Sequence, residues 1–149
     1  MKKFSYPMQN ILNLKLKMEE QEKNNYSIAK HKLTIEENIL NSYVERKLSY
    51  EEELRQEMSS KLNLLNVKRL EEAIETMKSM IKTQTQVVKK AEQSVDLAMQ
   101  KLRHAMTERK THEKLKEKAL EEYKNEFNQE EKKEIDGLVS FQHAIRKSI

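Results

Sequence analysis

A narrow apolar seam between Val67 and Ala105 is the feature that most restricts how this chain can fold. Positions alternately three and four residues apart are apolar at eleven of twelve places, and the exception is Gln84. A spacing of 3.5 residues kept over this length is typical of a coiled coil, in which each seam residue enters a hole between side chains of a facing helix. The twelve seam positions are Val67, Leu70, Ile74, Met77, Ile81, Gln84, Val88, Ala91, Val95, Ala98, Leu102 and Ala105.

The composition also favours long helices over a compact core. The 149 residues include one Gly and one Pro, where average usage would give about ten and seven. Turns depend on those residues, so the chain can contain very few turns. Hydrophobic and charged residues each make up 36% of the chain, which suits helices that share one seam and leaves too little apolar surface for a layered domain.

A first helix is predicted from about residue 8 to about residue 57. Pro7 fits its first turn, where the missing N–H is not needed. Apolar residues spaced seven apart then form a sparse row, which Glu19 and Lys47 interrupt. Other apolar residues flank this row on both sides, so the pattern does not assign a single coiled-coil register to the first helix. The row is Leu12, Tyr26, Leu33, Leu40 and Leu54.

The plausible chain reversal lies at about residues 58–64, where two serines and an asparagine can divert backbone hydrogen bonds and cap a following helix. A second helix then runs from about residue 64 to about residue 136. If the chain folds back, the first helix covers the second as far as about His112, close to the end of the apolar seam. The expected reach of the first helix and the end of the apolar seam thus coincide, which favours an intramolecular antiparallel hairpin over a parallel dimer or one unbroken helix.

Beyond the seam the second helix becomes strongly charged and is predicted to overhang the first. Between Glu108 and Asp136, eighteen of twenty-nine residues carry a charge. Gly137 is expected to loosen or end this helix, leaving residues 137–149 as an amphipathic tail that can fray. We therefore predict an all-α fold and a single coiled-coil domain over residues 1–149.

No catalytic constellation, cofactor site or metal site is predicted. His104, Glu108 and His112 share one helix face at i, i+4 and i+8, but a further strong ligand is missing, which favours an exposed charged row. Tyr43 and Tyr50 lie seven residues apart near the hairpin tip. They can pack on the flank of the seam or form a partly exposed protein-binding patch with Met residues of the other helix.

The remaining composition gives few indications of function. The chain has no cysteine, which is compatible with a reducing cytoplasm, and we expect neither a signal peptide nor a membrane span. The net charge is +4, with both signs interleaved along most of the chain. The first 32 residues hold seven Lys and three Glu, so an acidic partner, or nucleic acid bound by the basic N-terminus, remains an alternative to a solvated face.

Three stretches of the sequence carry a resemblance to a known family. The first is Val95-Asp96-Leu97-Ala98-Met99, the second runs from Glu108-Arg109-Lys110-Thr111-His112 to Lys118, and the third is Lys132-Lys133-Glu134-Ile135-Asp136. Together they resemble the flagellar export protein FliJ family, and the third resembles the closing Lys-Glu-Leu-Asp-Glu-type motif of that family. His112 and Gly137 depart from the family pattern, in which an apolar and an acidic residue are usual.

The resemblance implies a non-enzymatic, stalk-like component of the flagellar type III export apparatus. Such a protein would insert into the hexameric export ATPase ring, promote its assembly, contact the membrane export gate and bind export chaperones. It would lie in the cytoplasm at the inner face of the membrane, and flagellum biogenesis, motility and chemotaxis would depend on it. No nucleic acid or small-molecule substrate is implied, and we expect the chain to be a monomer by itself.

The resemblance also suggests two contact surfaces. The ATPase-ring contact would be Arg109, Lys110, Lys114, Leu115, Lys116 and Lys118. The export-gate contact would be Tyr43, Tyr50, Ala73, Met77, Met80 and Gln84. Two alternatives stay open at this point: the equivalent stalk protein of a virulence type III secretion system, and a structural coiled coil that dimerises in parallel through residues 67–105.

Overall fold

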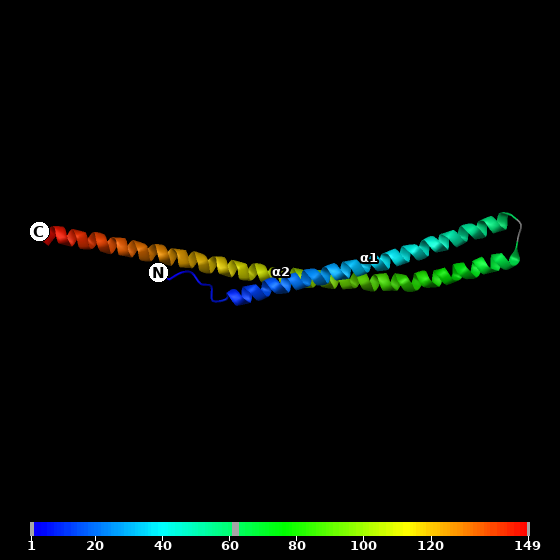
Figure 1. Ribbon diagram of the computed structural model, residues 1–149, viewed down its shortest axis with the longest axis horizontal. Helices are drawn as coiled ribbons and strands as arrows, with labels where there is room; N and C mark the ends of the chain where they lie inside the picture. The colour runs from blue at the N-terminus through cyan, green and yellow to red at the C-terminus, as the bar shows by residue number, and fades with distance from the viewer. Residues whose placement is uncertain (1, 61–62, 149) are drawn as a thin grey trace. The chain divides into compact units, whose positions relative to one another are not determined.

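The fold is all-α and consists of two long helices. The computed structural model describes residues 2–60 and 63–148, and this part of the chain contains α1 (Gln9–Ser59) and α2 (Leu64–Ser148) and no strand. The two helices pack against each other and α2 is the longer, which confirms the predicted fold class (Figure 1). Within the expected reversal at 58–64, Lys61 and Leu62 lie outside the described residues.

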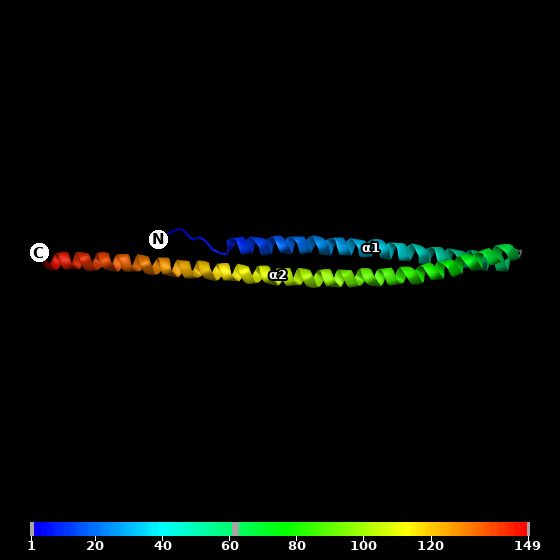
Figure 2. The same ribbon diagram turned by 90° about the horizontal axis from the view of Figure 1, so that it is seen from below.

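Tertiary contacts divide the chain into two compact units, each built from a part of both helices. The terminal unit comprises Met1–Glu20 and His104–Ile149, and the central unit comprises Gln21–Arg103. The sequence pattern, in contrast, predicts a single coiled-coil domain over residues 1–149. Within each unit α1 and α2 lie side by side in both views (Figures 1 and 2).

The antiparallel direction of the helices can be followed from contacts inside each unit. In the terminal unit Lys15 of α1 pairs with Glu108 of α2, whereas Lys2, earlier in the chain, meets Tyr123, later in the chain. In the central unit Glu36 of α1 accepts hydrogen bonds from the side chain of Gln84, whereas Tyr43, later in the chain, lines a hollow with Ser79 and Met80, earlier on α2. Contacts of this kind bury one face of each helix and supply most of the stability of helices this long.

The helix ends on either side of the reversal are satisfied by local side chains. The hydroxyls of Ser59 and Ser60 both donate to the carbonyl of Gln56, each at 3.0 Å. The Oδ1 atom of Asn63 accepts from the amides of Leu65 and Asn66 at 3.2 and 3.4 Å. Asn63 is therefore the N-cap of α2, the role that its position before a helical pattern predicts.

The expectation that Gly137 could end the second helix is wrong, because α2 continues through it to Ser148. Gly137 keeps a helical backbone without a positive φ. A glycine in a helix costs only about 1 kcal/mol relative to alanine, which is too little to end a helix of 85 residues. The tail at 137–148 is therefore helical, and its side chains are exposed.

The α2 seam forms the core as predicted. All twelve seam positions are buried or half-buried, including Gln84. The apolar residues that are buried outright are Leu12 of α1 and Leu70, Ile74, Met77, Val88, Ala91, Leu102 and Ala105 of α2. Since α1 of the same chain covers this seam in the central unit, the structure argues against the parallel dimer through residues 67–105.

The α1 seam has a regular register that its apolar residues alone do not reveal. Buried or half-buried positions alternate at three and four residues, but several of them are charged. The positions are Leu12, Lys15, Glu19, Glu22, Tyr26, Ala29, Leu33, Glu36, Leu40, Tyr43, Lys47, Tyr50, Leu54 and Glu57. Ile28 and Leu48, which are apolar, are instead 67% and 57% exposed.

As far as the structure describes them, neither α1 nor α2 contains an apolar stretch that could cross a membrane.

Candidate functional site

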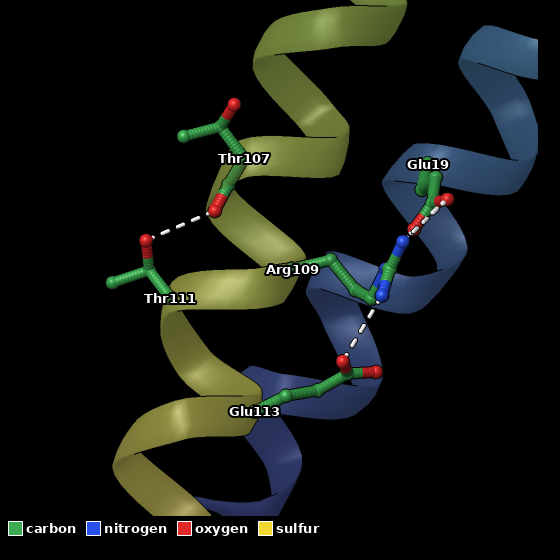
Figure 3. Close-up of polar contacts among 5 residues, drawn as sticks. All are labelled: Glu19, Thr107, Arg109, Thr111 and Glu113. Atoms are coloured by element: carbon green, nitrogen blue, oxygen red, sulfur yellow. Dashed lines mark hydrogen bonds and ion pairs between the residues drawn. The ribbon is translucent and has the colours of Figure 1, made fainter.

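An ion-pair cluster lies where the first of the predicted ring-contact residues meets α1. Arg109 of α2 donates through Nε and Nη2 to the carboxylate of Glu19, the second of these bonds at 3.3 Å. Its Nη1 donates to Glu113 at 3.0 Å, one turn further along α2. Figure 3 shows the guanidinium reaching across to α1 between the two carboxylates.

The electrostatics of this cluster hold both partners in place. The Glu19 side chain is 7% exposed and that of Arg109 is 20% exposed. The hydrogen bond to Glu19, followed by that to Glu113, raises the pKa of Arg109 above its ordinary value. Because the shift is upward, the resulting stabilisation is fully present below the ordinary arginine pKa and is lost only at still higher pH.

More charged pairs surround this cluster. Lys15 of α1 lies 3.4 Å from a carboxylate oxygen of Glu108. The same carboxylate has His104 at 3.8 Å and His112 at 4.0 Å. The row His104, Glu108 and His112 is expected to be exposed, but only His104 is exposed, whereas Glu108 and His112 are half-buried. No group of three or more His, Cys, Asp or Glu in the described ranges is arranged to hold a metal ion.

The other predicted ring-contact residues are mostly exposed. Lys110, Lys114, Leu115 and Lys118 are exposed on α2, whereas Lys116 is half-buried. Thr107 and Thr111 lie on the side of α2 away from α1, where the Thr111 hydroxyl donates to the Thr107 carbonyl at 2.9 Å (Figure 3). Lys110, Lys114 and Lys118, spaced four residues apart, make one basic row on this helix. Arg109 differs from these lysines because its guanidinium is hydrogen-bonded to Glu19 and Glu113 within the terminal unit.

The paired part of the terminal unit extends further along α2 than the sequence predicts. The expectation is that pairing stops near His112, but the segment before α1 continues it. The hydroxyl of Tyr123 donates to the carbonyl of Lys2 at 2.6 Å, and the rings of Phe4 and Tyr123 are 5.4 Å apart. From residue 128 to residue 148, every residue of α2 is exposed. The unpaired part of α2 is therefore shorter than expected.

The predicted gate-contact residues lie in the central unit, and several of them come together. Tyr43 of α1 and Met80 and Gln84 of α2 line one open hollow, with Ser79 and Thr83. Tyr50 and Ala73 are each half-buried. They lie seven residues from Tyr43 and Met80 on the same two antiparallel helices, so the register places them opposite each other one heptad closer to the reversal.

Two of these predicted gate-contact residues face inward. Met77 is 3% exposed and Gln84 is 8% exposed. The Nε2 atom of Gln84 donates to the carbonyl and to the carboxylate of Glu36, at 3.0 and 2.6 Å. Both side chains therefore contribute mainly to packing, although Gln84 also borders the hollow beside Tyr43. Tyr43, Tyr50, Ala73 and Met80 remain partly accessible.

Sequence reasoning missed Glu19 as a member of the Arg109 cluster. It treats Glu19 as an interruption of the sevenfold row on α1, although the carboxylate lies at the seam position that the row defines. Arg109 likewise occupies the position four residues after Ala105. Opposite charges at seam positions of two antiparallel helices are the signal that could have found the pair. The aromatic contact of Phe4 had no comparable signal.

The fold defines an antiparallel coiled-coil protein with charged and aromatic side chains accessible on both helices. The family model of the flagellar FliJ protein matches residues 4–148. The chain therefore belongs to the flagellar FliJ family, whose members are non-catalytic components of flagellar protein export. Neither a curated protein nor a solved structure matches the chain.

Proposed function

We propose that this protein is the stalk-like regulator of the flagellar export ATPase. In this role the terminal unit inserts into the hexameric ATPase ring and promotes its assembly, and the central unit contacts the cytoplasmic domain of the export gate. The protein also binds export chaperones and works in the cytoplasm, beside the membrane at the flagellar base. The observation that carries the proposal is the family match over residues 4–148.

The basic row of α2 is suited to a ring contact that forms and breaks repeatedly. Lys110, Lys114 and Lys118 are exposed and point away from the seam. An exposed ion pair contributes only about 0–1 kcal/mol, so several of them give an orientation preference without permanent attachment. A family match to the flagellar protein also favours this reading over a virulence secretion system.

The ring contact is tested with the double variant Lys114→Glu and Lys118→Glu. We expect weaker co-purification with the export ATPase, while helicity by circular dichroism stays unchanged. The matched control is Lys89→Glu with Lys90→Glu, which makes the same change in net charge on exposed residues of α2 in the central unit. Unaltered ATPase association in the first variant, or equal loss in both, would remove the assignment.

The gate contact is tested separately with Tyr43→Ser and Tyr50→Ser. Aromatic side chains supply much of the energy of protein interfaces, so this variant should lose association with the gate domain and keep association with the ATPase. Tyr26→Ser is the control, because Tyr26 is a half-buried tyrosine of the same α1 seam. Retention of gate binding by the double variant would contradict the placement of this surface.

A further inference from the structure

The final turns of α2, at residues 137–148, differ in composition from the stretch that precedes them. Between Glu108 and Asp136, eighteen of twenty-nine residues carry a charge, and both signs occur. Among residues 137–148 only Arg146 and Lys147 are charged, and the sequence has no Asp or Glu there. This basic segment is exposed at every residue, and no other described part of the chain lies beside it in either view (Figures 1 and 2).

The basic segment is amphipathic. Leu138, Phe141 and Ile145 follow the i, i+3, i+7 spacing of one helix face, and they are 62%, 63% and 42% exposed. His143 and Lys147 lie four residues apart on the opposite face, as the 3.6-residue period requires. Apolar side chains gathered on one face are unfavourable in water. The segment therefore has an apolar face that the rest of the described chain leaves open.

The charges beside this face indicate what covers it. A coiled-coil partner helix calls for a long apolar row with flanking charges of both signs. In the basic segment the apolar row covers only about two turns, and its charged neighbours, Arg146 and Lys147, are both positive. Phe and Leu on one face with Arg and Lys on the remainder are typical of a helix that lies in the headgroup region of an anionic membrane.

We propose that residues 137–148 bind the surface of a membrane that contains anionic lipids. The helix lies along the surface with Leu138, Phe141 and Ile145 among the first carbons of the acyl chains. Arg146, beside this face, reaches the lipid phosphates, and Lys147 adds attraction to the negatively charged surface. The inference rests on the proposed position of the protein beside the membrane, and it adds the segment and the lipid chemistry that hold the protein there.

The length of the segment fits a helix that lies on the membrane. Twelve residues span about 18 Å at 1.5 Å per residue, whereas the hydrocarbon core is about 30 Å thick. The apolar face can therefore enter one leaflet only at its surface. The segment begins well beyond Lys118, so it includes none of the residues assigned to the ring or gate contact.

Insertion is tested with a single tryptophan, because the chain has none of its own. The indole lies on the apolar face in Phe141→Trp and on the polar side of the same turn in Ser140→Trp. The vesicles contain equal parts phosphatidylglycerol and phosphatidylcholine, with or without brominated acyl chains. We expect a blue shift and quenching by the brominated chains in Phe141→Trp, and neither in Ser140→Trp. Equal responses of the two proteins overturn the inference.

The apolar contribution to binding is measured by sedimentation of the full chain with the same vesicles. Phe141→Ser combined with Ile145→Ser should require about tenfold more lipid for the same bound fraction, because two apolar side chains no longer enter the membrane. The matched control is Leu64→Ser combined with Leu65→Ser, which removes two exposed leucines at the start of α2. The control should bind like the unsubstituted chain, and an equal loss in both variants overturns the inference.

The electrostatic contribution is measured in the same way. Arg146→Glu combined with Lys147→Glu should also require about tenfold more lipid, and binding of the unsubstituted chain should weaken as salt is added. Lys89→Glu combined with Lys90→Glu makes the same change in net charge outside the segment and should bind like the unsubstituted chain. The inference is overturned if the unsubstituted chain does not sediment with the anionic vesicles, or sediments equally with vesicles of phosphatidylcholine alone.

These measurements separate the membrane contact from the proposed function. They include neither the export ATPase nor the gate domain, so absence of vesicle binding would leave the ring and gate contacts standing. Loss of those contacts in their own variants would likewise leave vesicle binding intact. A chain that ignores vesicles would show that the apolar face serves a protein partner, which overturns the lipid assignment.

Discussion

At the scale of single residues, polar side chains at seam positions set how α1 and α2 align. Glu19 and Arg109 meet in the terminal unit, and Gln84 meets Glu36 in the central unit. An apolar seam alone tolerates sliding by a heptad, because one leucine fits most holes as well as another. A buried polar group left without its partner is costly, so these two contacts penalise other registers.

The Glu19–Arg109 pair predicts an asymmetry between single and double substitutions. Arg109→Leu leaves the buried Glu19 carboxylate without its main donor, so it should lower the urea midpoint measured by circular dichroism at 222 nm. Glu19→Leu should lower it as well. The double variant Glu19→Leu with Arg109→Leu extends the apolar seam and should recover the midpoint or exceed it, since replacing a whole buried pair is often neutral or stabilising.

Additive losses in that double variant would contradict the reading of the pair as a register device. They would mean that each residue stabilises the protein through separate neighbours. Lys15→Leu is the matched control, because it removes a charge at a neighbouring α1 seam position whose partner, Glu108, is 38% exposed. Its effect should be small, since exposed pairs contribute little.

Gln84→Glu is predicted to be destabilising at pH 7 and less destabilising in acid. The substitution keeps the shape of the side chain but replaces the donor to Glu36 with a second carboxylate. The free energy of unfolding should fall by about 1–3 kcal/mol at pH 7. The difference should shrink as pH falls, because a proton shared by the two adjacent carboxylates restores one of the two hydrogen bonds that the amide donates. The measurement is urea unfolding of both proteins from pH 3 to 8, and a pH-independent difference would contradict the prediction.

At the scale of the helices, α2 could be predicted from sequence better than α1 for a physical reason. Its seam is filled by apolar side chains, so hydrophobic periodicity and burial coincide. On α1, half of the burial pattern comes from charged or small residues such as Glu22, Ala29 and Glu36. Periodicity in hydrophobicity cannot find positions that are buried because a polar partner lies opposite them.

Gly137 is predicted to be a weak point that can be strengthened without changing contacts. A methyl group added at its Cα would have no neighbour within 4 Å, and its backbone is already helical. Gly137→Ala should therefore stabilise the helix locally by about 0.5–1 kcal/mol. Amide hydrogen exchange at residues 134–141 should slow by about two- to fivefold, while exchange at residues 70–90 stays the same. Faster exchange near the substitution would contradict this.

At the scale of the whole chain, the fold follows from the sequence more directly than the contact surfaces do. One Gly, one Pro and one sustained seam leave few arrangements besides two packed helices. The surfaces are different, because exposure depends on which neighbouring residues the partner helix covers. Met77 and Gln84 already lie on the predicted seam, but how far Tyr43 and Met80 stay exposed depends on the placement of α1. The contact of Phe4 with Tyr123 joins residues whose positions no periodicity links.

The covered seam makes a final prediction about the whole molecule. Because α1 of the same chain buries Ile74 and Val88, folding requires no second copy. The thermal midpoint should therefore be independent of protein concentration over about a hundredfold range, whereas a dimer that folds on association would show a rising midpoint. Ile74→Ala should lower stability by about 2–4 kcal/mol through loss of buried side-chain volume and should remain independent of concentration. Light scattering of both proteins should give the mass of one chain, and a midpoint that rises with concentration would restore the parallel dimer through residues 67–105.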